Sequence, residues 1–387
     1  MKRSSLETKV VRKIEDIPAK DWNSIFPTRL EGYDFFKTLD ESRLGQFSFY
    51  YIAVYDAGII IAAAACFLLD YSLDTTVGGS LRRFSNFIKK FFPGAFSMRT
   101  LLCGLPMGQG RIGIAGQAGA EAVIEIYAAM ERIAAEEKAS IIAFKDFASG
   151  DVARLDPLLR LGFSRFESLP STEMRIDFTD FDSYLKSMSR VSRDGLKRKF
   201  KKIDGSVKIA LETKNSLSEE ELGQVYALYL QTVEKHEMGF ERLTPEFFRN
   251  ASRNMPDRTR FFLWRMDGRL AAFAFCLVSG GDFIDYYLGF DYSIAHRYHL
   301  YFVRFRDLMK WCIANKVKRY EMGATNYEPK RRLGFEFVPL FIYAKHRSRL
   351  VNPLFRLFCR FLEPKNFDPV IRQAMSKQSD VAEKRKL

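Results

Sequence analysis

The chain has 387 residues, a length that predicts two or three domains, each large enough to bury its own core. Hydrophobic residues make up 47% and charged residues 28%, a composition that excludes global disorder and fibrous repeats. Lysine and arginine outnumber aspartate and glutamate by 61 to 47, so the net charge of +14 favours anionic partners such as lipid, cofactor phosphates or nucleic acid.

The N-terminal residues 1–16 contain no apolar stretch after their basic residues, which a secretory signal would require. The longest uninterrupted apolar run, 59–69, is about half as long as a bilayer-spanning helix. The five cysteines lie far apart, so the sequence predicts neither a disulfide framework nor a metal site. We therefore expect a cytoplasmic protein without bound metal and without a transmembrane helix.

The first half predicts a strand pair followed by alternating strands and helices. The β-rich runs 47–55 and 59–69 flank the turn-prone Asp56-Ala57-Gly58, which suits a tight hairpin. A basic aromatic insertion at about 77–97 follows. Next come a strand, a glycine-rich stretch, a helix over 120–137, an apolar strand, a short helix and a last strand.

The second half repeats this order, again with a hairpin, a strand, a long helix over 299–316, a strand and a short helix. Leu161-Gly162-Phe163 and Leu333-Gly334-Phe335 occupy the same place in the two halves, 172 residues apart. Five elements in the same order around this match favour a duplicated domain. The joint falls near 168–172, where the pattern breaks.

The order of elements resembles the GNAT acyltransferase fold, and two tandem copies resemble the Fem-type aminoacyl transferases and related N-acyltransferases of bacterial envelope metabolism. In the second half, 192–199 resembles the family segment S-x-x-R-x-x-L-R-R, Tyr287 to Asp291 resembles its Y-x-G-Y-D strand end, and Met322 to Gly334 resembles its D-x-G … Y-K … G stretch. The resemblance implies an α/β fold of two GNAT-like domains with mixed sheets flanked by helices.

On this basis we predict an N-terminal GNAT-like domain over 1–168, a C-terminal one over 169–348, and an amphipathic segment with a basic tail over 349–387. The first copy has glycines over 108–119, where GNAT enzymes carry a phosphate-binding loop, although a flexible connection is an equal alternative. The second copy lacks these glycines, so the sequence leaves open which copy holds the donor.

Acyl transfer from a thioester to an amine needs a base, a donor to the oxyanion and a proton for the leaving sulfur. We name His236 and Glu321 as competing bases, with a surface role for His236 and an ion pair for Glu321 as alternatives. The resemblance makes Tyr327 the proton donor to the thiolate. Residues expected to bind the donor's phosphates are Arg297, Tyr298 and His299 at the start of the long helix. The resemblance adds Lys330, which matches a lysine of the family and is otherwise a solvated lysine.

Two segments have the composition of interfacial helices. In 81–96 an apolar stripe is flanked by cations, and the predicted membrane-binding residues are Phe84, Phe87, Phe91, Phe92, Lys89 and Lys90. In 349–364 the apolar residues Leu354, Phe355, Leu357, Phe358 and Phe361 accompany Arg356 and Arg360. We predict peripheral binding to an anionic membrane surface at the inner face of the cytoplasmic membrane, with packing on the domain as the alternative.

The main functional hypothesis is transfer of a long-chain acyl group from acyl-CoA or an acyl-carrier thioester to the amine of a lipid or sphingoid base. Bacterial ceramide synthesis is the named activity that fits it, and an acyl carrier protein is a possible partner. The first alternative is a Fem-type transferase that uses aminoacyl-tRNA and a peptidoglycan precursor, with the basic run 193–202 contacting RNA. The second alternative is a non-catalytic basic adaptor for membranes or nucleic acid.

Overall fold

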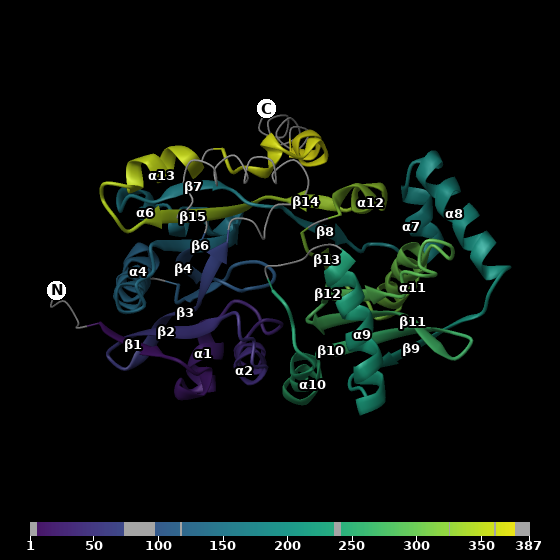
Figure 1. Ribbon diagram of the computed structural model, residues 1–387, viewed down its shortest axis with the longest axis horizontal. Coiled ribbons are helices and arrows are strands. Elements are labelled where there is room, and N and C mark those ends of the chain that lie inside the picture. Colours follow the sequence, from purple (N-terminus) through teal and green to yellow (C-terminus); the bar gives the residue numbers. More distant parts are fainter. Residues whose placement is uncertain are drawn as a thin grey trace. The chain divides into compact units, whose positions relative to one another are not determined.

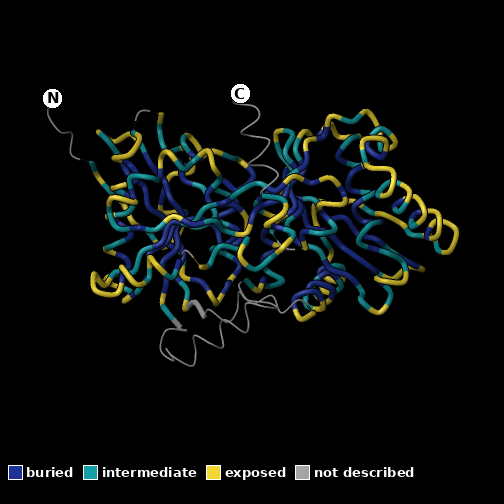
Figure 2. The backbone as a smooth tube through the Cα atoms, turned by 90° about the horizontal axis from the view of Figure 1, so that it is seen from above, coloured by how far each residue is buried: buried dark blue, intermediate teal, exposed yellow. Residues whose placement is uncertain are grey.

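The computed structural model describes residues 6–72, 97–116, 118–235, 241–324, 326–359 and 361–375. The chain divides into two compact units (Figure 1). Unit 1 comprises Met1–Ser171, Met238–Arg242 and Phe337–Leu387, and unit 2 comprises Thr172–Glu237 and Leu243–Glu336. Each unit contains one mixed sheet with helices, which confirms the predicted α/β class. Buried residues follow the strands in both units (Figure 2).

Unit 1 is built on a sheet in the order β1-β2-β3-β4-β6-β15-β7, with β5 paired to β3. Its strands are β1 (Glu7–Val11), β2 (Ser48–Asp56), β3 (Ile59–Ser72), β4 (Ser97–Cys103), β5 (Ile112–Ile114), β6 (Ile141–Ala148), β7 (Ser164–Glu167) and β15 (Leu340–His346). Its helices are α1 (Ala19–Ile25), α2 (Tyr33–Glu41), α4 (Gly119–Glu136), α5 (Val152–Leu155), α6 (Pro157–Arg160) and α13 (Asn352–Cys359), with short 3₁₀ turns at Ile14–Asp16, Ser149–Asp151 and Pro364–Asn366.

The predicted hairpin and long helix of unit 1 are confirmed. Strands β2 and β3 pair antiparallel, and both Ala57 and Gly58 have positive φ, as a two-residue hairpin turn requires. Helix α4 buries one face, including Val123, Ile126 and Met130, because its apolar residues recur at helical spacing.

Unit 2 is built on a sheet in the order β14-β8-β13-β12-β11-β10-β9. The strands of this sheet are β8 (Ser171–Arg175), β9 (Ile209–Lys214), β10 (Thr259–Met266), β11 (Arg269–Ser279), β12 (Asp282–Phe290), β13 (Arg319–Met322) and β14 (Glu336–Val338). Its helices are α7 (Phe181–Ser187), α8 (Arg190–Asp204), α9 (Glu219–Lys235), α10 (Pro245–Asn254), α11 (Leu300–Ala314) and α12 (Tyr327–Arg332).

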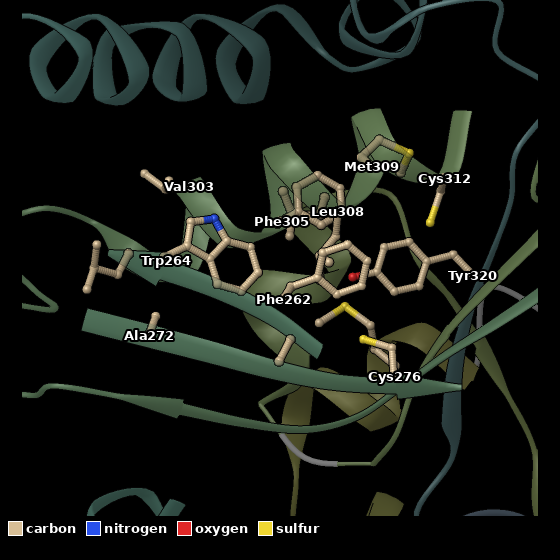
Figure 3. Packing of buried hydrophobic residues seen from close by; sticks show 14 of the residues in the cluster. Phe262, Trp264, Ala272, Cys276, Val303, Phe305, Leu308, Met309, Cys312 and Tyr320 are labelled. Atoms are coloured by element: carbon tan, nitrogen blue, oxygen red, sulfur yellow. The ribbon is translucent and has the colours of Figure 1, made fainter. Parts of the chain in front are cut away.

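One core of unit 2 lies between its sheet and α11. Phe262 and Trp264 of β10 project toward Phe305 and Leu308 of the helix, together with Tyr320 of β13 (Figure 3). These side chains are 1% exposed or less, so they fix α11, and with it the turn that precedes the helix, against the strands.

The chain exchanges one strand between its two sheets. Strand β8 follows the first half in sequence but pairs with β13 of unit 2, and β15 follows the second half but pairs with β6 and β7 of unit 1. The sequence analysis placed β15 inside a domain over 169–348, and in the structure this strand belongs to unit 1. Strand pairing is set by contacts distant in sequence, which local patterns do not report.

Two further predictions concern membranes. Residues 81–96, with the predicted membrane-binding Phe84, Phe87, Phe91, Phe92, Lys89 and Lys90, lie outside the described residues. Within the described part of the chain, none of the helices is both long and apolar enough to cross a bilayer.

Candidate active site

Strands β12 and β13 form a parallel pair that ends abruptly inside unit 2. The pairing runs from Asp282 opposite Arg319 to Asp285 opposite Met322, and β12 then continues to Phe290. At the same point β12 contains a bulge, because Phe275 of β11 pairs with Tyr287 while the adjacent Cys276 pairs with Asp285. A bulge bends its strand and redirects the side chains around it. The parallel pairing therefore ends at Asp285 while β12 continues beside β11, and we call this place the strand opening.

Lys330 of α12 lies at the end of β13 next to the strand opening. Its Nζ donates to the backbone oxygen of Gly323 at 2.5 Å and lies 3.5 Å from that of Met322. The side chain is buried, and burial lowers the pKa of Lys330 to about 7, with Asp285 raising it and Arg304 lowering it further. The solvated-lysine alternative is therefore wrong, because this amine is buried.

A buried ion pair lies beside this lysine. Arg304 of α11 donates from Nη1 to Asp285 Oδ2 at 2.5 Å, and the Tyr320 hydroxyl donates to the same oxygen at 3.0 Å. Arg304 is completely buried, and its Nε and Nη2 have no partner among the described residues. The sequence analysis missed Asp285 and Arg304. The signal was an acid inside the apolar strand run 283–290 and an arginine on the apolar face of the helix that follows.

Glu321 is buried, and it is one of three acids around a single arginine. Arg319 donates to Glu321 Oε2 at 3.3 Å, to Glu173 Oε1 at 2.9 Å and to Asp282 Oδ1 at 2.9 Å. This is the ion-pair alternative named for Glu321. Its role as a base stays a prediction, as does the role of Tyr327, which is the first residue of α12 and is buried. His236 lies outside the described residues.

Arg297, Tyr298 and His299 form the turn before α11, as predicted, and His299 takes a left-handed conformation there. Burial lowers the pKa of His299, and Lys199 and Lys202 of α8 lower it further. Cations from α8 therefore gather at the N-terminal end of α11, where the helix dipole also favours an anion. Binding of donor phosphates by this turn remains a prediction.

A cleft of about 860 Å³ in unit 2 lies between α8 and α12. Lys199 and Phe302 border it near the start of α11, and Arg331 and Arg332 border it on α12, directly after Lys330 in sequence. Apolar side chains such as Met174 also line it. The volume lies within the range of small-molecule sites.

Unit 1 has the corresponding parallel pair, but its own backbone lies at the end of it. Strands β4 and β6 pair from Thr100 to Cys103, and further along β6 Gly110 forms a parallel bridge with Phe147. The Gly110 N–H donates to the Asp146 oxygen at 2.8 Å, and a Cβ on Gly110 would lie 2.0 Å from the Lys145 oxygen. Gly110 is therefore required for close backbone packing, which accounts for part of the glycine stretch otherwise interpreted as a phosphate loop.

Unit 1 also lacks the lysine. Leu158 precedes Leu161 by three residues just as Lys330 precedes Leu333, and each accepts a backbone hydrogen bond from that leucine, at 2.9 and 3.1 Å. Leu158 is completely buried. The position that holds an amine in unit 2 thus holds an apolar side chain in unit 1.

Comparison with known proteins identifies the family. A family model described as FemAB-like, peptidoglycan biosynthesis/recognition, matches residues 13–366. This chain belongs to the FemAB-like family. The resemblance stated from the sequence is thereby confirmed for almost the full length of the chain.

Among curated proteins, the chain is 26% identical over 337 residues to a putative 8-amino-7-oxononanoate synthase 2 of Mycobacterium tuberculosis. The match covers 84% of this chain and 43% of that protein, so the chain spans less than half the length of the curated relatives it matches.

Among solved structures, FemX gives a TM-score of 0.57 at 13% identity, over 92% of this chain and 100% of FemX. A tandem GNAT protein from the clavulanic acid biosynthesis pathway gives 0.50 at 11% identity, over 89% of this chain and 99% of that one. These likenesses confirm the tandem GNAT fold. No group of three or more metal-ligating side chains occurs in the part of the chain that the structure describes.

Proposed function

We propose that unit 2 of this FemAB-like chain catalyses N-acyl transfer at the strand opening. In this proposal the donor is aminoacyl-tRNA, and its aminoacyl group is transferred to an amine of a peptidoglycan precursor. One observation carries the proposal: a buried lysine with a pKa of about 7 lies where the parallel pairing of β12 and β13 ends. A buried amine that changes protonation near neutral pH at such a place is a candidate acid–base group.

The chemistry follows from that position. The acceptor amine attacks the ester carbonyl of the donor, a C–N bond forms, and a tetrahedral oxyanion results. In this proposal, backbone N–H groups of β12 beyond Asp285, where the pairing with β13 has ended, stabilise that oxyanion. Neutral Lys330 takes the proton that the attacking nitrogen loses. It then returns this proton to the oxygen of the departing tRNA ribose as the C–O bond breaks, so the amide and a free hydroxyl are the products.

The choice of tRNA as donor rests on α8 and on the family. Helix α8 buries Leu196, Phe200 and Ile203 and exposes cations on its remaining surface. The exposed cations are Arg190, Lys197, Arg198, Lys201 and Lys202. Exposed cations on one helix can neutralise the phosphates of a nucleic acid backbone. Aminoacyl-tRNA is a cytoplasmic donor, so the proposal places the reaction on the cytoplasmic side.

The second candidate is transfer from acyl-CoA or an acyl-carrier thioester to a lipid or sphingoid amine, the main hypothesis from the sequence. The observation that favours it is that Lys199 and Lys202 act on His299 of the 297–299 turn at the start of α11, where a helix N-terminus and cations favour a phosphate. In this reaction Lys330 again takes the proton from the attacking amine, and it returns this proton to the departing thiolate.

The experiment supplies both donors in separate reactions. The full chain is incubated with total tRNA charged with amino acids and a lipid-linked peptidoglycan precursor, or with a long-chain acyl-CoA and a long-chain amino alcohol. Mass spectrometry detects the amide, and the Lys330→Met variant is the inactive control. We expect an aminoacylated precursor that disappears when the tRNA is deacylated beforehand. An amide formed from acyl-CoA alone would move the assignment to the second candidate, and no amide from either pair would overturn both.

A further inference from the structure

Helix α13 of unit 1 and its flanking residues expose several large apolar side chains. Leu350 is 93% exposed, and Leu354, Leu357 and Phe361 are 60%, 53% and 56% exposed. Successive members lie three or four residues apart, so they form one stripe along the segment 350–361. A surface helix of a globular protein normally turns its polar face outward, and α13 does the opposite.

The opposite side of the helix is attached to unit 1. Asn352 accepts from the His346 N–H at 3.0 Å and donates to the Gly162 oxygen at 2.9 Å. The Phe355 ring lies 6.2 Å from the His346 ring, and Cys359 is completely buried. Because Asn352, Phe355 and Cys359 share one face, the helix cannot turn its apolar stripe inward without breaking these contacts.

The stripe is a concentration of exposed apolar surface. Of the twelve exposed large hydrophobic residues among the described ones, five lie between Leu350 and Phe361. The other seven are spread over both units, and single exposed hydrophobic residues need no partner. A cluster of this kind marks a surface that binds something.

The charge around the stripe selects the partner. Arg349 and Arg356 are exposed beside the stripe, and residues 348–362 contain no aspartate or glutamate. Two copies of this segment placed face to face would bring arginines together, which disfavours self-association. An anionic lipid surface offers hydrocarbon to the stripe and phosphates to the arginines at once, which is how interfacial helices bind.

We infer that α13 with its flanking residues, 349–361, docks unit 1 onto an anionic lipid surface, with Leu350, Leu354, Leu357 and Phe361 in the headgroup and acyl boundary. This inference is independent of the reaction proposed for unit 2. It concerns a different unit and would hold for either donor.

The test places a fluorescent reporter on the stripe of the full chain. The five cysteines are all buried, so Leu357→Cys can be labelled selectively with a nitrobenzoxadiazole probe. Ile59→Cys is the matched control, since Ile59 is 71% exposed in the same unit but far from α13 in sequence. Vesicles contain phosphatidylglycerol in phosphatidylcholine, or phosphatidylcholine alone.

We expect a blue shift of the probe at 357 with the anionic vesicles, little shift with the neutral ones, and weakening at about 0.5 M NaCl as charges are screened. The probe at 59 should not respond. An unchanged spectrum at 357, or equal shifts at both positions, would overturn the inference.

A second measurement does not depend on the label. Leu354→Ser combined with Leu357→Ser should reduce the vesicle partition coefficient roughly tenfold or more, because about two leucines lose contact with the hydrocarbon. The thermal midpoint should stay unchanged, since both side chains are exposed. Unchanged partitioning would contradict the inference, and so would a parent dimer, seen by sedimentation without vesicles, that the double variant dissociates.

Discussion

The two units share a strand order and differ at the single place where chemistry is expected. In unit 1 the end of the parallel pair is occupied by the chain itself, through the bridge from Gly110 to Phe147, and the short helix carries Leu158. In unit 2 the parallel pair ends at a bulge, and the short helix carries Lys330. Both short helices end in the same way, with Gly162 and Gly334 each at φ 90°. A duplicated fold can therefore keep its backbone in both copies while the reactive groups stay in one.

The strongest test of this comparison replaces each of the two equivalent side chains, Lys330 and Leu158, by methionine in a separate variant. Lys330→Met should lower turnover by about 10²–10⁴-fold, since it removes the group that moves the proton. Leu158→Met preserves volume in the equivalent position of unit 1 and should leave turnover within about threefold. Steady-state rates of amide formation measure both. Equal losses in the two variants would mean that the lysine acts through stability alone.

The Lys330→Met variant and the parent should differ in how their thermal midpoints depend on pH. The pKa of Lys330 in the folded chain, about 7, lies below the ordinary value of 10.5, so the unfolded chain binds the proton more readily between these values. The lysine therefore destabilises the fold fully below pH 7, and the effect is lost as the pH rises toward 10.5. The thermal midpoint of Lys330→Met relative to the parent should accordingly be higher at pH 6 than at pH 9.

The buried ion pair of unit 2 should dominate the stability of its core. Asp285→Asn leaves the buried Arg304 without its counter-charge, and loss of one partner of such a pair typically costs about 3–5 kcal/mol. Asp204→Asn breaks the exposed pair with Arg306 and should cost about 0–1 kcal/mol. Urea denaturation followed by tryptophan fluorescence reports both. A cost below about 1 kcal/mol for Asp285→Asn would show that Arg304 is compensated in another way.

For unit 1 the prediction concerns packing. Gly110→Ala places a Cβ against the Lys145 oxygen and should destabilise the chain by about 1–3 kcal/mol. Gly116→Ala, in the same glycine-rich stretch, meets nothing within 4 Å and should be neutral. Thermal melting distinguishes them. If instead Gly116→Ala raised the KM for a donor while both variants stayed stable, this stretch would be a binding loop after all.

The smallest expected effect is that of the exposed cations of α8. Lys197→Glu with Arg198→Glu should raise the KM for aminoacyl-tRNA roughly five- to tenfold with little change in turnover, because phosphate contacts are made equally before and during the reaction. The control pair Lys13→Glu with Lys20→Glu reverses two exposed cations of unit 1. An unchanged KM would argue against RNA as the donor.

The sequence predicted the elements better than the site. The helix expected over 120–137 is α4 at Gly119–Glu136, because its apolar periodicity is local. Strand β15 was assigned to the second domain although it pairs in the sheet of unit 1, because nothing in a strand's own residues specifies its partner. Lys330 was singled out from the resemblance, but its burial depends on how α12 packs against the end of β13. Asp285 could have been found, because an acid within an apolar strand run needs a buried partner.

The central claim is that the buried amine of Lys330 carries the proton in the reaction at the strand opening of unit 2. The pH dependence of single-turnover amide formation tests it most directly. For the parent we predict a rate that rises with pH through about 7 and then levels, because the lysine must be neutral to accept the proton. The Lys330→Arg variant should react slowly at all pH values, and its rate should not rise through pH 7. A Lys330→Arg variant that kept both the parent rate and its rise with pH through about 7 would contradict the account.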